Sequence, residues 1–402
     1  MPIDSIRMNF RDVKESLVAL ILCTFGDLIT GVVMGHSSAK FGLIPALILL
    51  IPPSIGLRGN IYASLGSRLG SYLHTGRIAP RLEANPLVLK NISSSTFLLL
   101  VFSVVNGAFA AVVAYIMGLS LNVENVCIDL ILISAISAFL SAALMIPATL
   151  MLAIGSFRWG WNPDNLTAPL ITLFGDLITL PLIFVAADAV ISMETTYKAY
   201  GIVLILVTSL LLLFASRSEM GLRIVRESMP ILAVCTFLQF GAGAILGGEL
   251  DKFIAIAGLL TVVPAFLEDG GAMGGILAAR FSTMLHLGLL EPSIKPQKDV
   301  LLNFGAMHVI ALVIFSLVGV IGYAVNVMLS LPTIPLIEMV LVTLLAGQLL
   351  MLMIDAMSYY FSIISFKKGL DPDNVGIPLI TSFMDVLGTA CYVVALKVFQ
   401  VV

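Results

Sequence analysis

Two aspartates, Asp176 and Asp385, have the residue type and the surroundings that most clearly suggest chemistry. Each ends the motif Pro-Leu-Ile-Thr-x-Phe-x-Asp, which occurs twice in the sequence. A proline in the first turn of a helix would place each aspartate about 10 Å into that helix, at ~1.5 Å per residue. Thr172 and Thr381 lie one turn earlier on the same face, so each helix carries a polar stripe.

If both stripes face a common axis, the two carboxylates meet there. Two close carboxylates repel each other, so they share a proton unless a cation lies between them. A site with only oxygen ligands suits hard ions such as Mg²⁺ or Ca²⁺. The alternative is structural, with each acid capping the backbone of a neighbouring helix. We favour the ion site because both copies of the motif keep the acid, and the stripes continue about one turn later with Thr179 and Thr389.

A third aspartate, Asp27, belongs to a phrase that also occurs twice. Phe-Gly-Asp-Leu-Ile-Thr covers residues 25–30 and again residues 174–179. The internal repeat described below puts Gln239, which is not an acid, at the position equivalent to Asp27. The two repeats therefore differ at this position, and only the first has an acid there. It is either a site for a coupling ion or proton, or a buried acid paired with a helix dipole or a hydroxyl.

Other polar residues within apolar stretches complete the set of candidates. Asp355 has no acidic counterpart, and the same two interpretations apply to it. Two stretches rich in proline and glycine differ in charge, since one contains Arg58 and the other Glu268 and Asp269. Such stretches favour either an unwound backbone that lines a cavity or a plain helix kink. The candidate pore or coupling residues are Asn60, Thr172, Thr381, Asp27, Asp355, Glu268 and Asp269.

The composition places these residues in a membrane. Only 11% of the 402 residues are charged, against about 25% in an average soluble domain, and 59% are hydrophobic. This excludes a soluble enzyme, a nucleic-acid-binding module and a secreted disulfide scaffold. An acid inside a bilayer costs about 3 kcal/mol or more, so it usually faces a cavity, a partner or an ion.

Eleven apolar stretches, each near the ~20 residues that a bilayer requires, predict an all-α polytopic membrane protein. They are centred near residues 26, 52, 106, 140, 180, 207, 238, 264, 315, 350 and 388. With the N-terminus inside, 16 of the 21 basic residues fall on the inner side, 4 fall on the outer side and Arg58 lies within a span. Basic residues favour cytoplasmic loops. We therefore expect a multi-pass protein of the cell membrane with a cytoplasmic N-terminus and an extracellular C-terminus.

The sequence also repeats itself. Stretches near its start recur at a numbering shift of 212, and stretches near its middle recur at a shift of 209. Because these matches continue in the same order over five spans, each half is predicted to be a five-span repeat. Six spans, an even number, separate equivalent positions, so the halves should be parallel, with any site near the interface of the repeats. We expect a first repeat over residues 1–192, a linking transmembrane helix over 193–218 and a second repeat over 219–402.

Three features of the aligned halves resemble one known family. These are the Gly59-Asn60 segment, the last-span aspartates Asp176 and Asp385, and two stretches that look like the family's Asp-Pro turn, Asn162-Pro163-Asp164-Asn165 and Asp371-Pro372-Asp373-Asn374. Together they resemble the MgtE-type magnesium transporters, and within them the fused two-repeat solute carrier family 41. The resemblance covers nearly the whole chain. It implies that Asp176 and Asp385 line an ion pore.

Two features depart from the family pattern. Ala272 stands where the second half would repeat Asn60. The apolar run of the first span begins at Leu17, close to the start of the sequence, so we expect none of the cytoplasmic regulatory domains of the bacterial members.

We predict a divalent cation transporter or channel, for Mg²⁺ before other divalent cations, with one pore between two pseudo-symmetric halves. Asp176 and Asp385 are the predicted metal ligands. Mg²⁺ loses its water reluctantly, so the two acids should hold it largely through its waters. The expected partners are membrane lipids and divalent cations, with Na⁺ as a candidate coupling ion. We expect a monomer to suffice, because the two repeats replace a homodimer.

Two rival functions follow from the same residues. A Na⁺- or H⁺-coupled cation exchanger would use Asp27 or Asp355. A metal-dependent membrane enzyme acting on lipid headgroups would hold its metal at Asp176 and Asp385. The sequence favours transport, and predicts that the protein is not an enzyme, because no nucleophile or general base accompanies the acids.

Overall fold

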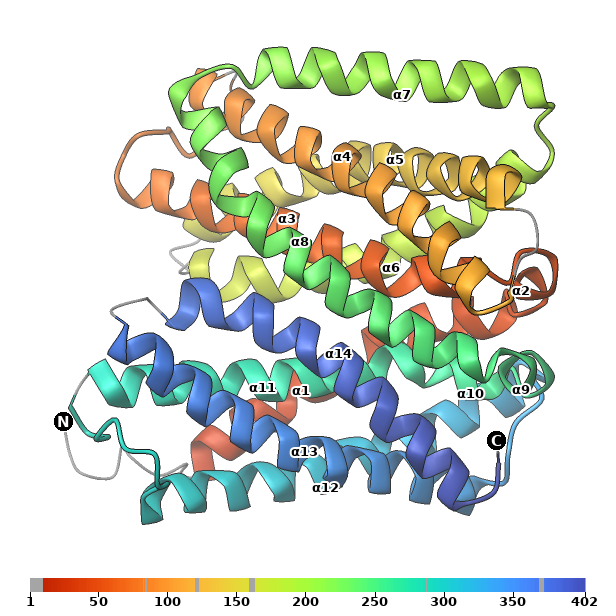
Figure 1. Cartoon of the computed structure of the whole chain (residues 1–402). Helices are drawn as coiled ribbons and strands as arrows, with labels where there is room; N and C mark the ends of the chain where they lie inside the picture. Colours follow the sequence, from red (N-terminus) through yellow and green to blue (C-terminus); the bar gives the residue numbers. More distant parts are fainter. Residues whose placement is uncertain are drawn as a thin grey trace. The chain divides into compact units, whose positions relative to one another are not determined.

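The computed structural model describes residues 10–81, 83, 85–119, 123–158, 163–286, 288–368 and 372–401. Every regular element within these residues is an α-helix, which confirms the predicted all-α class (Figure 1). The long helices of the first half are α1 (Phe10–His36), α3 (Leu47–His74), α4 (Pro86–Ile116), α5 (Val123–Arg158), α6 (Pro163–Ile191) and α7 (Thr195–Ala215). Those of the second half are α8 (Glu219–Gly248), α11 (Val263–His286), α12 (Lys298–Met328), α13 (Leu336–Lys367) and α14 (Pro372–Val398). Three short helices, α2 (Ala39–Leu43), α9 (Leu250–Ala255) and α10 (Gly258–Thr261), connect them.

Ten of the predicted spans coincide with helical stretches that are long and apolar enough to cross a membrane within the described residues. The second predicted span coincides with α3, which is a helix but is not among these ten. Its polar residues, including Arg58 and Asn60, lower its hydropathy. The protein is a polytopic membrane protein, and the count of eleven spans stays a prediction.

Local sequence explains where the helices begin and end. Asn85 caps α4, since its side chain accepts a hydrogen bond from the backbone N–H of Leu87 at 2.9 Å, and Pro86 begins the helix. The chain leaves α3 and α11 through Gly76 and Gly288, whose φ angles of 67° and 69° suit glycine. The numbering shift of 212 relates these two glycines, so the repeat extends to the ends of the helices.

The two proline- and glycine-rich stretches are helical. The helix α3 continues through Pro52 and Pro53, and the carbonyl of Pro53 accepts a hydrogen bond from Asn106 at 3.2 Å. In the second half the interruption lies at Val262, between α10 and α11, and Glu268–Gly271 is helical. The expectation of unwound backbone at these residues is therefore wrong.

The helices form two compact units. Unit 1 comprises residues 1–43 and 244–402, and unit 2 comprises residues 44–243. In unit 1, α1 packs against α10, α11 and α12, while α13 packs against α11, α12 and α14. The first helix thus belongs to the unit that holds α11 to α14, while most of α8 belongs to unit 2. The predicted repeats, residues 1–192 and 219–402, were defined by sequence similarity, whereas the two units are defined by packing. The repeat boundaries therefore stay a prediction.

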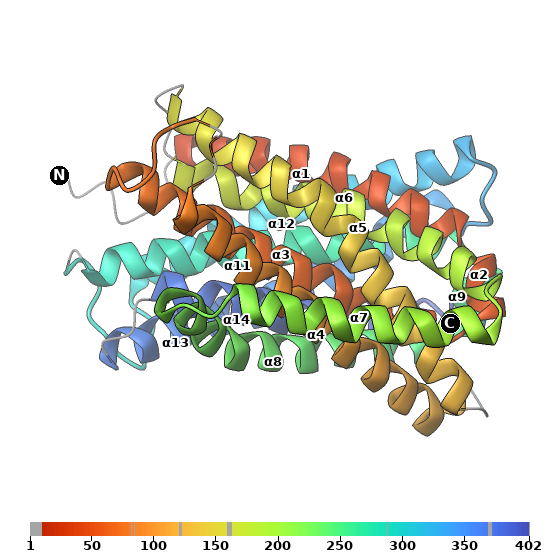
Figure 2. The same cartoon turned by 90° about the horizontal axis from the view of Figure 1, so that it is seen from above.

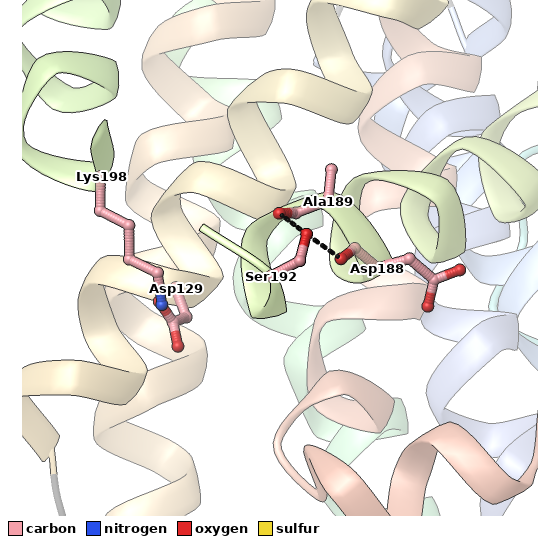
Figure 3. Close-up of polar contacts among 5 residues, drawn as sticks. All are labelled: Asp129, Asp188, Ala189, Ser192 and Lys198. Atoms are coloured by element: carbon pink, nitrogen blue, oxygen red, sulfur yellow. Dashed lines mark hydrogen bonds and ion pairs between the residues drawn. The ribbon is translucent and has the colours of Figure 1, made fainter. Parts of the chain in front are cut away.

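In unit 2 the helices α3, α4, α5 and α6 pack against one another, and α7 packs against α4 and α5. In both views α7 lies beside α4 and α5 (Figures 1 and 2). None of the side chains of α7 is buried. Lys198 of α7 forms an ion pair with Asp129 of α5 at 2.6 Å, and this contact fixes the first turn of α7 (Figure 3). The carboxylate of Asp188, on α6, points away from that pair (Figure 3).

Candidate functional site

Asp176 lies on α6 in unit 2, and its side chain is 6% exposed. One turn earlier, Thr172 faces α3, because a Cβ atom added at Gly59 would lie 3.5 Å from the Thr172 Cγ2. Gly59 precedes Asn60 in the segment that resembles the family motif. The structure therefore brings that segment against the helix that carries Asp176.

Unit 1 contains the same arrangement in α11 and α14. A Cβ atom added at Gly271 would lie 3.6 Å from the Thr381 Cγ2. The shift of 212 relates Gly271 to Gly59, and the shift of 209 relates Thr381 to Thr172. Asp385 follows one turn later on α14, and its carbonyl accepts a hydrogen bond from the Thr389 hydroxyl at 2.6 Å. Each unit thus has a threonine–glycine contact one turn before an aspartate.

Asp27 and Asp269 are buried in unit 1, each 0% exposed. The Thr24 hydroxyl, on α1, donates a hydrogen bond of 2.7 Å to Oδ2 of Asp269 on α11. Asp27 lies one turn beyond Thr24 on the same helix. Of the predicted coupling residues, Asp269 therefore has a defined partner, and that partner belongs to the helix that carries Asp27.

Unit 2 has a different polar pattern at the equivalent place. A Cβ atom added at Gly56 of α3 would lie 1.6 Å from the amide nitrogen of Gln239 on α8, so the Gln239 side chain lies directly against Gly56. The repeat maps Gln239 to Asp27, and Gly56 to Glu268. Where one repeat has glutamine against glycine, the other has two acids. The equivalent places are therefore chemically different.

Arg58 of α3 is a buried cation in unit 2. Its Nη2 donates a hydrogen bond of 2.7 Å to the Ser137 hydroxyl, and its Nη1 donates one of 3.2 Å to the carbonyl of Ser54. Neutral oxygens thus satisfy part of the guanidinium. The shift of 212 places Gly270 at this position in the second half, next to Asp269.

Asp355 has a partner that sequence reasoning missed, His308 on α12. Its Oδ2 lies 3.2 Å from Nε2 of His308, and Nδ1 of that ring lies 2.7 Å from Oε1 of Gln348. His308 stands alone in an apolar stretch, far from Asp355 in the sequence. Helical periodicity relates residues of one helix, so it cannot predict a contact between residues of two helices. Only the packing of α12 on α13 brings the two residues together.

Within the described residues, no three His, Cys, Asp or Glu side chains are grouped so that they could hold a metal ion. A pocket in unit 2 is lined by residues that include Leu69, Arg81, Glu83 and Leu150. None of the predicted site residues lines it. The pocket and the candidate residues are therefore separate features.

The described helices define a polytopic α-helical membrane protein that carries buried acids in its apolar helices, and such acids often mark ion pathways in membrane proteins. The chain belongs to the MgtE family, described as divalent cation transporters, whose family profile matches residues 51–186 and 263–395. One matched stretch lies in each half. This confirms the resemblance found from the sequence, and it identifies the chain as a divalent cation transporter.

Curated relatives agree with this assignment. Solute carrier family 41 member 3 of Rattus norvegicus is 27% identical over 398 residues, which cover 93% of this chain and 84% of the relative. The mouse member 3 is 28% identical over 367 residues, covering 86% of this chain and 73% of the relative. Human solute carrier family 41 member 2 is 26% identical over 404 residues, which cover 94% of this chain and 68% of the relative. No solved structure matches the chain.

Proposed function

We propose that this protein moves Mg²⁺ across the cell membrane through a pore between two parallel five-helix repeats, residues 1–192 and 219–402, joined by residues 193–218. The observation that carries the proposal is the doubled arrangement of Thr172 with Asp176 and Thr381 with Asp385. In each unit the threonine lies against a glycine of a neighbouring helix. These matched threonine–glycine contacts favour equal roles for the two aspartates.

The chemistry of the ion explains why two carboxylates suit it. Mg²⁺ requires octahedral oxygen coordination and keeps several of its waters. Carboxylates on opposite sides of a pathway would accept hydrogen bonds from those waters and balance the charge of the ion. The threonine hydroxyls one turn away extend the polar surface along each helix. A hydrated ion held in this way can also leave, since few direct bonds must break.

The orientation proposed is N-terminus in the cytoplasm and C-terminus outside, with a single chain sufficient for transport. The support is the distribution of basic residues, of which 16 of 21 fall on the inner side. Two repeats in one chain supply both aspartates, so a second copy is not needed for the site.

A coupled exchanger is the second candidate, and the buried acids of unit 1 favour it. Asp27 and Asp269 lie in apolar helices at no exposure, and Thr24 donates to Asp269. Acids at such depth in transporters usually bind a coupling ion or a proton. Na⁺ is the proposed coupling ion for Asp27, which has no acidic equivalent in the other repeat.

The test is Mg²⁺ flux into proteoliposomes that contain the purified protein and a trapped Mg²⁺-sensitive dye. We expect saturable uptake without any lipid substrate beyond the bilayer, with Ca²⁺ and Mn²⁺ as competitors. The comparison is made with and without an opposing Na⁺ gradient. A dependence on Na⁺ would establish coupling to it. Absence of uptake, with hydrolysis or exchange of lipid headgroups instead, would contradict transport and favour a membrane enzyme.

A further inference from the structure

Three polar side chains meet between α12 and α13 in unit 1. His308 on α12 contacts Gln348 and Asp355 on α13, through Nδ1 at 2.7 Å and Nε2 at 3.2 Å respectively. Both helices are long and apolar enough to cross a membrane. A histidine paired with an acid in such helices is costly to place in a membrane, so its presence indicates a function.

The hydrogen bonds determine where the protons lie. The Gln348 amide nitrogen donates to the backbone carbonyl of His308 at 3.4 Å, so the amide oxygen is the atom that faces the ring. An amide oxygen only accepts hydrogen bonds, so Nδ1 of His308 carries a hydrogen. Nε2 and the Asp355 Oδ2 then need one more hydrogen between them, because two bare lone pairs at this distance repel.

The pair therefore has two states that differ by one proton. With the proton, its net charge is zero, whether the proton lies on the ring or on the acid. Without the proton, its net charge is −1, and Asp355 becomes a buried carboxylate whose Oδ1 accepts no hydrogen bond within the described part of the chain. A buried charge of this kind is costly unless a cation comes near. Loss of the proton and arrival of a cation are therefore linked.

The fold does not require this pair. The repeat places Thr96 of α4 at the position of His308, and Ile146 of α5 at the position of Asp355. In unit 2, α4 packs against α5, and the two helices carry uncharged residues at these positions. The same two helices thus pack together in one repeat without the histidine–acid pair, which argues against a merely structural role.

Other titratable side chains lie on α12 and α13 and on the helices that pack against them. Tyr359, one turn beyond Asp355, donates hydrogen bonds to the carbonyls of Ser293 and Lys295 at 2.9 Å and 3.2 Å. His308 is the titratable group that contacts Asp355 directly. The remaining titratable groups in these helices include Tyr323 on α12, Asp27 on α1, Glu268, Asp269 and Arg280 on α11, and Asp385 on α14.

We propose that His308 and Asp355 form a proton-carrying site that releases one proton in exchange for each divalent cation transported. The inference rests on the proposed cation transport and adds the proton as an ion coupled to it, independently of any coupling to Na⁺. Each cycle moves one divalent cation one way and one proton the other, so one net positive charge follows the cation. Histidine suits this role because one ring nitrogen can take up or release a proton while the other keeps its hydrogen bond.

The experiment uses proteoliposomes with trapped dyes for Mg²⁺ and for pH, with the membrane potential clamped by K⁺ and valinomycin. We expect Mg²⁺ entry to be accompanied by exit of about one proton per ion. Asp355→Asn and His308→Gln should abolish the proton movement. Glu338→Gln, which changes an exposed acid on α13, is the matched control and should keep it.

The outcomes separate the two proposals. Mg²⁺ uptake by the wild type without proton movement would overturn the proton site and leave cation transport intact. No Mg²⁺ uptake at all would overturn the proposed function itself. Proton movement of normal size in Asp355→Asn would also overturn the site.

A second measurement does not depend on flux. Mg²⁺ is added to detergent-solubilised protein in weak buffer, and the released protons are counted for variants that stay monodisperse. Asp355→Asn should release about one proton per chain less than the Glu338→Gln control. If the single variants do not fold, the double variant His308→Gln/Asp355→Asn replaces them, since its two neutral side chains can still hydrogen-bond. Equal release from variant and control would overturn the proposal.

Discussion

Asp269 is a carboxylate in an apolar helix, and the Thr24 hydroxyl is a donor that reaches it from another helix. Water is absent from the apolar region of a bilayer, so a lost donor there has no ready replacement. Identical short stretches of sequence can also lie in different surroundings. Asp27 and Asp176 lie in the same six-residue phrase, but they belong to different units. We therefore expect the tertiary partners, and not the local sequence, to decide what each acid does.

Thr24→Ala should destabilise the protein. Removing the hydroxyl leaves Oδ2 of the buried Asp269 without its donor, which costs about 1–3 kcal/mol. The measurement is the free energy of unfolding in detergent. Thr208→Ala is the control, since its hydroxyl bonds the carbonyl of Leu204 on the exposed helix α7, and it should change stability by less than about 0.5 kcal/mol. If both substitutions lowered the free energy of unfolding by the same amount, the Thr24–Asp269 hydrogen bond would add no more to stability than the surface one.

Asp27→Asn should change ion coupling or transport rate while leaving divalent binding largely intact. The reason is that Asp27 has glutamine, not an acid, at its repeat equivalent, whereas Asp176 and Asp385 are equivalent to each other. Uptake kinetics and equilibrium Mg²⁺ binding are measured on the same preparation. A loss of Mg²⁺ binding as large as that of Asp176→Asn would refute this division of roles.

At the scale of elements, close helix contacts at glycine hold each unit together. A Cβ atom added at Gly31 of α1 would lie 1.8 Å from the carbonyl oxygen of Thr261 in unit 1. In unit 2, one added at Gly243 of α8 would lie 2.9 Å from the carbonyl oxygen of Leu49. Both residues of the second contact are related to those of the first by the shift of 212. Small residues at helix contacts let backbones approach, as is common in membrane proteins.

Gly31→Ala should destabilise unit 1, because the new methyl group meets backbone atoms that can move only with α10. We expect a loss of about 1–3 kcal/mol in the free energy of unfolding. Gly305→Ala on α12 is the control, since no atom lies within 4 Å of the added Cβ. Alanine is the better helix former, so this control should be neutral or stabilising by up to about 1 kcal/mol. Gly31→Ala at wild-type stability would show that the contact is looser than described.

The elements show how far sequence patterns reach. Apolar length predicted ten helices correctly, because burial in lipid demands long runs of apolar residues. The proline and glycine content of α3 suggested an unwound segment, but the helix continues there, with Asn106 bonded to the Pro53 carbonyl. That donor comes from another helix, so local sequence could not reveal it. His308 was missed for the same reason.

At the scale of the whole molecule, the repeat was visible in the sequence, whereas the composition of the units was not. The units group α1 with α10 to α14, because α1 packs on helices of the second half. Sequence similarity identifies which helices are equivalent, and packing decides which helices each one contacts. Hydrophobic periodicity carries no information about that choice.

The topology predicts the labelling of introduced cysteines in a variant that lacks its 4 native cysteines. A cysteine at position 122 should react with a membrane-impermeant maleimide from outside, and one replacing Ser293 should react only after permeabilisation. The basis is the distribution of basic residues. A reversed result at either position would refute the proposed orientation.

The central claim is that Asp176 and Asp385 act together on one ion, and uptake by their asparagine variants tests it most directly. Saturable Mg²⁺ uptake is measured for Asp176→Asn, Asp385→Asn and the double variant, all checked for folding. Asp188→Asn, which changes an exposed acid on the same helix as Asp176, is the control. We predict that each single variant abolishes saturable uptake and that the double variant adds little, because both acids are proposed to act on the same ion. The control should transport normally. Normal uptake by either single variant would contradict the account.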